Sequence, residues 1–138
     1  MKTSVYHIQI NISDPKVSLP FYKELFKYFE YKIISESPDH IGASNGTTDF
    51  WIMETEEKNK SSKFHRKTTG VNHISFKANS KEDVDSFTKD FLNKKGIKLL
   101  YETPKHFPEY TDGYYAVFFE DPDRIKLELA YVPNKAIK

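Results

Sequence analysis

The chain has 138 residues, which is enough for one domain or for two small modules that share a core. Its 21 basic and 20 acidic side chains give a formal charge of +1, so electrostatics offer no reason to expect nucleic acid or an anionic membrane as a partner. The absence of cysteine excludes disulfides, thiolate catalysis and cysteine-based zinc sites, so any metal would be held by histidine and carboxylate. Because the chain has no apolar stretch of about 20 residues and no signal-peptide core at its N-terminus, we expect a cytoplasmic protein with no membrane partner.

The first half of the chain predicts a strand, a helix and three further strands. We place the strand at 5–12, the helix from near Ser18, and the three later strands at about 31–37, 41–44 and 49–55. The start of the helix follows from Pro20, which cannot lie deep inside a helix and is therefore expected in its first turn. The Asn45-Gly46 dipeptide is typical of the tight turn that joins two antiparallel strands.

The second half predicts the same order of elements. We expect a strand at 71–78, a helix capped by Ser80 and ended by Gly96, and strands at about 97–102, 114–120 and 125–131. Residues 57–69 are polar and rich in lysine, and we interpret them as a linker between a module at 1–56 and a module at 70–134. The fold class is therefore α+β: two β-α-β-β-β modules in a single domain, 1–138, with a mostly antiparallel sheet and helices on its outer face.

The two halves are also related in sequence. A shift of 66 positions, the difference between His73 and His7, brings several segments into register without a gap. The matching pairs are 5–8 with 71–74, 21–26 with 87–92, and 31–34 with 97–100. One register thus holds through strand, helix and strand, which predicts an internal duplication.

His7 and His73 occupy equivalent positions in the two first strands, on the side opposite the apolar residues that should pack on the helices. Glu128 alternates with Leu127 and Leu129 on the last strand, so it also points away from the helix side. Two imidazoles and one carboxylate suit a divalent transition metal such as Zn²⁺, Fe²⁺, Ni²⁺ or Mn²⁺ and leave positions open for a substrate. We predict a metal site formed by these three side chains, and the other interpretation is that they are polar residues on a hydrated face.

A fourth ligand is left open by the spacing. The first-half partner of Glu128 is Glu54 if the preceding turns of the two halves align without a gap. It is Ile52 if a longer turn is allowed so that the apolar residues of the two strands match. Both would face the same way, so the alternation does not choose between them.

Several aromatic and apolar residues are candidates for contact with a substrate. Tyr114 and Tyr115 open an apolar run and point to opposite faces, so one of them should reach the pocket. We also include Phe50 and Ile52 as predicted substrate contacts, and expect Trp51 to be a core residue. The remaining histidines, His40, His65 and His106, are expected at the surface.

Taken together, these motifs resemble the vicinal oxygen chelate superfamily, which includes glyoxalases, extradiol dioxygenases and bleomycin resistance proteins. The residues that carry the resemblance are His7 through Asp14, Phe21 through Phe26, Gly70 through Phe76, and Glu120-Asp-Pro-Asp123 through Leu127-Glu128-Leu129. The resemblance spans nearly the whole chain. It departs from the family at Arg124, where glycine is usual after Asp-Pro-Asp.

The resemblance implies a glyoxalase-like domain in which two modules form a cupped sheet around a metal bound by His7, His73 and Glu128. It further implies a metal-dependent enzyme that acts on a small oxygenated substrate, either a lyase or isomerase or a ring-cleaving dioxygenase. A catalytic pair of Glu128 and Glu54 would favour glyoxalase-like proton transfer, whereas the three ligands alone match the two-histidine, one-carboxylate set of iron oxygenases. A protein that binds an antibiotic or metabolite without catalysis is the alternative, and the modules could pair within one chain or across a homodimer.

Overall fold

The computed structural model describes residues 1–133; residue 134, the last of the predicted second module, and residues 135–138 lie outside the described part. The chain divides into two compact units, Met1–Lys63 and Phe64–Lys138, and each is considered by itself. The division falls within the segment 57–69 that the sequence indicates as a linker. No helix of the described residues is long and apolar enough to cross a membrane.

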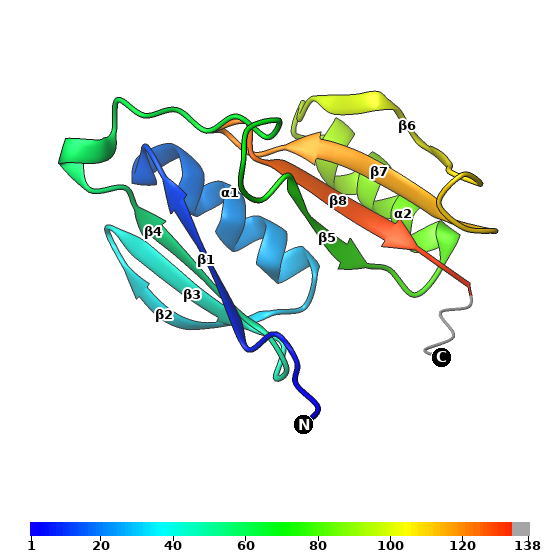
Figure 1. Ribbon diagram of the computed structural model, residues 1–138, viewed down its shortest axis with the longest axis horizontal. Helices are drawn as coiled ribbons and strands as arrows, with labels where there is room; N and C mark the ends of the chain where they lie inside the picture. Colours follow the sequence, from blue (N-terminus) through cyan, green and yellow to red (C-terminus); the bar gives the residue numbers. More distant parts are fainter. Residues whose placement is uncertain (134–138) are drawn as a thin grey trace. The chain divides into compact units, whose positions relative to one another are not determined.

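The first unit is a four-stranded sheet with one helix on one face (Figure 1). Its elements are β1 (His7–Ile12), α1 (Pro15–Tyr28), β2 (Lys32–Ser37), β3 (His40–Ser44) and β4 (Asp49–Glu54), followed by the short helical turn η1 (Glu57–Asn59). The strand order is β1-β4-β3-β2, with β1 parallel to β4 and the other neighbours antiparallel. The helix packs on β2, β3 and β4 through side chains such as Tyr22, Leu25 and Phe26, which are fully buried.

The second unit repeats this arrangement (Figure 1). Its elements are β5 (His73–Lys77), α2 (Lys81–Phe87), which continues into a wider helical turn η2 (Thr88–Asn93), then β6 (Leu99–His106), β7 (Tyr115–Glu120) and β8 (Lys126–Tyr131). The strand order β5-β8-β7-β6 has the same single parallel pair, β5 with β8. The α+β fold class with two β-α-β-β-β modules is therefore confirmed.

The start of α1 differs from the sequence prediction. The helix begins at Pro15 rather than near Ser18, and Pro20 lies inside it. The cap is Asp14, whose side chain accepts a hydrogen bond from the backbone of Lys16 at 3.0 Å. Proline at the first helical position costs nothing because its missing N–H would have had no partner there. The prediction was wrong because it gave Pro20 more weight than the Asp14-Pro15 pair.

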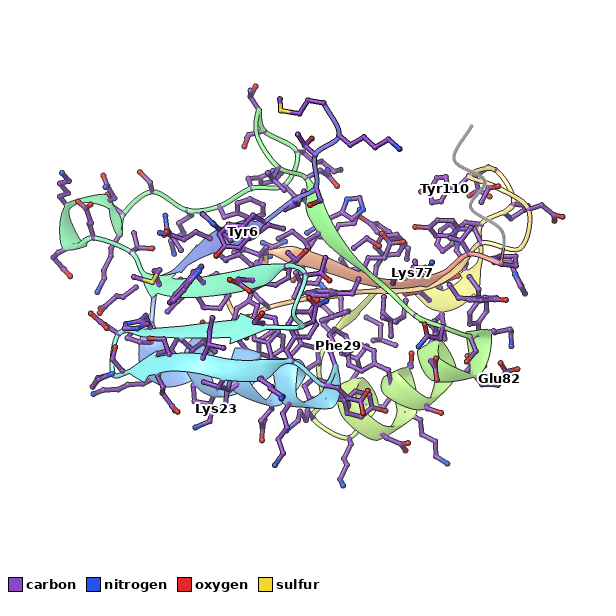
Figure 2. The ribbon with its side chains drawn as sticks, turned by 90° about the horizontal axis from the view of Figure 1, so that it is seen from below. Tyr6, Lys23, Phe29, Lys77, Glu82 and Tyr110 are labelled. Carbon is purple, nitrogen blue, oxygen red and sulfur yellow. The ribbon has the colours of Figure 1, made fainter. Side chains whose placement is uncertain are left out.

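The start of α2 is as predicted. The Ser80 hydroxyl accepts a hydrogen bond from the backbone of Asp83 at 3.0 Å, and the Asp83 carboxylate accepts one from the backbone of Ser80 at 3.1 Å. At the other end, Gly96 adopts a left-handed conformation with φ of 66°, which ends the helical segment. Figure 2 shows Glu82 in the first turn of α2, where an acidic side chain favours the positive end of the helix.

One glycine in β3 is required by a close approach. A methyl group at Gly42 would lie 2.7 Å from Cζ3 of Trp51, the residue paired with it on β4. We predict that Gly42→Ala lowers the free energy of unfolding by about 1–3 kcal/mol, because the ring must move out of its position. Chemical denaturation of Gly42→Ala in the wild-type and Trp51→Leu backgrounds checks this. An equal loss in both backgrounds would show that the indole is not the cause.

Candidate functional site

The centre of the candidate site is a pair of side chains from two neighbouring strands of the second unit. The strand register places four side chains on the sheet face opposite α2: His73, Lys126, Glu128 and Phe118. We call this surface the His73 face. Nε2 of His73 lies 3.0 Å from Oε2 of Glu128. The predicted orientation of Glu128, away from the helix and toward His73, is confirmed. Glu128 is 1% exposed, so its carboxylate is almost completely shielded from solvent.

The neighbour of His73 sets the orientation of its ring. Nδ1 of His73 lies 2.8 Å from Oδ1 of Asn72, while the amide nitrogen of Asn72 donates to the backbone carbonyl of Arg66 at 3.0 Å. The Asn72 oxygen is therefore the atom that faces the ring, and it can only accept. Nδ1 of His73 must carry a proton, which leaves the lone pair of Nε2 pointing at Glu128.

A neutral His73 would then bring two acceptor atoms, Nε2 and Oε2, to 3.0 Å from each other. Such a contact is repulsive unless a cation separates the two atoms or a second proton lies on the ring. Two atoms that bind one metal ion at about 2.1 Å and at a right angle are about 3 Å apart. The chemistry and spacing of this pair therefore fit two ligands of a divalent metal.

Tyr114 supplies the third contact of the buried carboxylate. Its hydroxyl donates a hydrogen bond to Oε1 of Glu128, so the two carboxylate oxygens have different partners. Burial, together with the neighbouring Glu128, raises the pKa of the Tyr114 phenol well above its ordinary value. The phenol therefore stays protonated and can hold the carboxylate in one orientation. Of the two predicted tyrosines, Tyr114 is the one on the His73 face.

Apolar and aromatic side chains surround this polar pair. Leu100, Phe107, Ala116, Phe118 and Ala130 form one buried cluster against which Tyr114 packs. The ring of Phe107 stacks on Tyr110 at 5.1 Å between centroids, and Tyr110 meets the edge of Tyr114 at 5.3 Å. Figure 2 shows Tyr110 in the loop between β6 and β7 and Lys77 on β5. Phe107, Tyr110 and Tyr114, here called the aromatic wall, offer flat surfaces to an organic ligand.

The first unit contributes its predicted residues in a different arrangement. His7 lies exposed at the start of β1, in the place that His73 has on β5. Glu54 forms an ion pair with Lys60 at 2.7 Å. In register, Gln9 pairs with Trp51 on β4 as Ser75 pairs with Glu128 on β8. Trp51 is therefore the counterpart of Glu128. The predicted alignment of Glu54 or Ile52 with Glu128 was wrong, because both residues lie on the opposite face of β4 from Trp51.

Three predicted substrate contacts lie on the helix side of their sheets. Phe50 is 3% exposed and packs against Phe26 of α1 at 5.3 Å between ring centroids, and Ile52 is fully buried on the same face. The hydroxyl of Tyr115 donates to Asp85 of α2 at 2.6 Å. Substrate contact by these residues stays a prediction, and their positions give them a packing role.

The Tyr115–Asp85 bond predicts a pH-dependent contribution to stability. Burial and Asp85 raise the pKa of Tyr115 to about 12, and the hydrogen bond from Tyr115, with help from Lys81, lowers the pKa of Asp85. We expect Tyr115→Phe to lower the free energy of unfolding by about 1 kcal/mol at pH 7. Because the folded pKa of Asp85 is depressed, this difference is present above the unfolded value of about 3.9 and is lost as pH falls through the folded value. Urea unfolding at pH 7 and pH 3 checks this; a constant difference at both pH values would contradict it.

Within each unit, the described residues contain no group of three or more histidine and acidic side chains that could hold a metal. The second unit supplies the pair of His73 and Glu128, and the first supplies His7 at the equivalent position. Sequence reasoning missed Asn72, which orients His73. Its position directly before the histidine was the available signal, since metal-binding histidines usually donate their second N–H to an oxygen.

Comparison with known proteins gives consistent matches along the chain. Residues 4–129 match the model of the glyoxalase/bleomycin resistance protein/dioxygenase superfamily. The uncharacterised protein YqjT of Bacillus subtilis is 36% identical over 125 residues, which cover 91% of this chain and 96% of that protein. A proposed glyoxalase from Bacillus halodurans is 34% identical, with a TM-score of 0.84 over 93% of this chain and 95% of its own. The lactoylglutathione lyase of Agrobacterium tumefaciens shares the fold, with a TM-score of 0.69 at 18% identity over 95% of each chain.

Proposed function

Because the chain belongs to the glyoxalase/bleomycin resistance protein/dioxygenase superfamily, we propose that it is a metal-dependent enzyme acting on a small oxygenated organic molecule. The proposed ligands of a divalent transition metal are His7, His73 and Glu128. One observation carries the proposal: Nε2 of His73 and Oε2 of Glu128 face each other at 3.0 Å, while Nδ1 of His73 donates its hydrogen bond to Asn72. This spacing and protonation suit two neighbouring ligands of one ion.

The third ligand rests on the internal duplication. His7 is equivalent to His73 by the repeat, and the same histidine position on two related strands is the argument for including it. In the first unit, the counterpart of Glu128 is Trp51, and Glu54 is paired with Lys60. These placements favour a set of two histidines and one carboxylate over a set with a fourth protein ligand. That smaller set leaves open positions and is the one used by non-haem iron oxygenases.

The protein's own residues have separate tasks in this proposal. A bound divalent ion would supply Lewis acidity toward oxygen atoms of the substrate. Glu128 supplies negative charge in a dry environment, Tyr114 holds a proton at Oε1 of Glu128, and Asn72 fixes the His73 ring. The aromatic wall of Phe107, Tyr110 and Tyr114 would stack on a planar organic group.

The second candidate is a protein that binds a small molecule without catalysis. It is favoured by the same aromatic wall and by the contacts of Glu128, whose two oxygens are both satisfied by Tyr114 and His73 when a second proton lies on the His73 ring. In that case the polar pair would recognise the ligand by hydrogen bonds, and the protein would need no metal.

Metal analysis of the purified full-length chain separates the two candidates. We expect about one transition-metal ion per chain by elemental analysis, together with recovery of the same content when chelated protein is dialysed against Fe²⁺, Mn²⁺, Zn²⁺ or Ni²⁺ in turn. Protein that binds none of the four ions at micromolar concentration, yet still binds aromatic ligands, would favour the binding protein.

A further inference from the structure

A buried cation on the His73 face has no acidic partner among residues 1–133. Lys126 precedes Glu128 by two residues on β8 and is 9% exposed. Its ammonium group lies 4.7 Å from the ring centroid of Phe118 and 4.8 Å from that of Tyr101, and donates a long hydrogen bond of 3.4 Å to Asn72. Among the residues that the structure describes, no carboxylate forms an ion pair with Lys126 within 4.0 Å.

A second cation nearby also has unused hydrogen-bonding capacity. Arg66 pairs with Glu120 through Nη1 at 2.8 Å, and its side chain is 17% exposed. Nε of Arg66 is buried and has no hydrogen-bond partner. Among the described residues, no other buried side-chain nitrogen or oxygen atom lacks one. Glu120 pairs with Arg66 and, at 3.7 Å, also with Arg124, and Arg66 keeps its Nε–H free to donate.

Tyr101 joins the two cations. Burial opposes ionisation of its phenol, but the hydrogen bonds and charges of Lys126 and Arg66 outweigh burial and lower the pKa of Tyr101. Its backbone has φ of 59°, and that of Glu102 has φ of 54°, a conformation that residues other than glycine adopt at a cost. This irregular part of β6 is the point at which the register with β7 shifts. Tyr101 is 46% exposed, and its phenol lies beside both Lys126 and Arg66.

The physical argument is one of charge balance. Cation–π contacts with Phe118 and Tyr101 compensate part of the hydration that Lys126 loses, but a buried ammonium group usually has an anion beside it. The polar groups gathered here are an ammonium, a guanidinium N–H and a phenol hydroxyl, all of which can donate a hydrogen bond. Donors of this kind, gathered at one place, match the oxygen atoms of an anion.

We propose that Lys126, Arg66 and Tyr101 form a binding site for an oxyanionic group, a carboxylate or a phosphate, of the ligand. If the bound anion is part of the substrate, this inference rests on the proposed function and narrows its substrate to an organic acid or a phosphate ester. Asn72, which contacts both Lys126 and His73, connects the anion site to the pair of His73 and Glu128.

Titration of the full-length protein with inorganic phosphate and, separately, with acetate tests the proposal. Two-dimensional amide NMR at constant ionic strength follows the backbone signals of these residues, first in the protein as purified and then after chelation of metal. We expect saturable shifts for at least one anion, and the one that binds more tightly identifies the chemical source. Lys126→Met should weaken that binding about tenfold or more, and Tyr101→Phe should weaken it several-fold.

The matched control is Lys105→Met. Lys105 is an exposed cation of the same sheet, placed 5.3 Å from the ring centroid of Phe107, so its removal also deletes a cation–π contact. Anion affinity should be unchanged in this variant. Thermal unfolding of Lys126→Met in anion-free buffer is expected to give an equal or higher melting temperature, because a methionine of similar length needs no counter-ion.

Three results would overturn the proposal: no saturable shift with either anion, equal affinity in wild type and Lys126→Met, or a melting temperature lowered by Lys126→Met with anion affinity retained. Because the titration is repeated on chelated protein, anion binding that persists in a chain with no affinity for metal would keep this site and refute the metal enzyme. A chain that binds metal but no anion would keep the proposed metal enzyme and refute this anion site.

Discussion

Replacement of His73 with alanine is expected to lower the affinity of the chain for its divalent metal at least about a hundredfold. The variant removes one of the two donor atoms that face each other at 3.0 Å and leaves only His7 and Glu128 of the three proposed ligands. Glu128→Gln should cause a comparable loss, since an amide keeps the shape of the side chain but carries no charge. Equilibrium dialysis followed by elemental analysis measures both effects on folded protein.

The control for this prediction is His106→Ala. His106 is an exposed histidine at the end of β6 whose ring meets the edge of Tyr115 on the helix side. Its removal should leave metal content unchanged, which separates a specific site from general binding to surface histidines. If His73→Ala and His106→Ala retained the same metal content as the wild-type chain, the ligand assignment would be lost.

Most of the fold could be predicted because two independent patterns agree. Alternation of apolar and polar residues gives the strands, and the shift between His7 and His73 gives the order of the elements twice. The error at the start of α1 arose where local chemistry decides, because Asp14 and Pro15 start this helix earlier than Pro20 suggested.

The site was predictable in one unit and less so in the other. Glu128 could be placed on the His73 face because Leu127 and Leu129 on either side must be buried. The strand Asp49–Glu54 offered no such constraint, since Phe50, Trp51, Ile52 and Met53 are all large and apolar. Alternation cannot assign faces in such a run, and only the pairing of β4 with β1 shows that Trp51 is the counterpart of Glu128. Contacts such as Tyr114 with Glu128, fourteen positions away in sequence, depend on strand register and loop path, which sequence patterns do not determine.

The second large effect concerns stability and follows from the burial of Glu128. We expect the double variant Tyr114→Phe with Glu128→Leu to raise the free energy of unfolding of metal-free protein by about 1–4 kcal/mol. A carboxylate that is 1% exposed, with a neutral phenol and an imidazole as partners, loses more hydration than these contacts return. Leucine has a similar volume and would join the cluster of Phe118, Ala116 and Ala130. Changing both residues avoids leaving the Tyr114 hydroxyl buried without an acceptor.

Urea unfolding in the presence of a chelator measures this difference. The single variant Glu128→Leu serves as the comparison, because it leaves the Tyr114 hydroxyl unpaired and should gain less or become less stable than the wild-type chain. A buried acid that costs stability is retained for chemistry rather than for packing. A double variant that unfolds at lower urea concentration than the wild-type protein would instead make the carboxylate a structural element of the second sheet, and its proposed role as a ligand would lose this support.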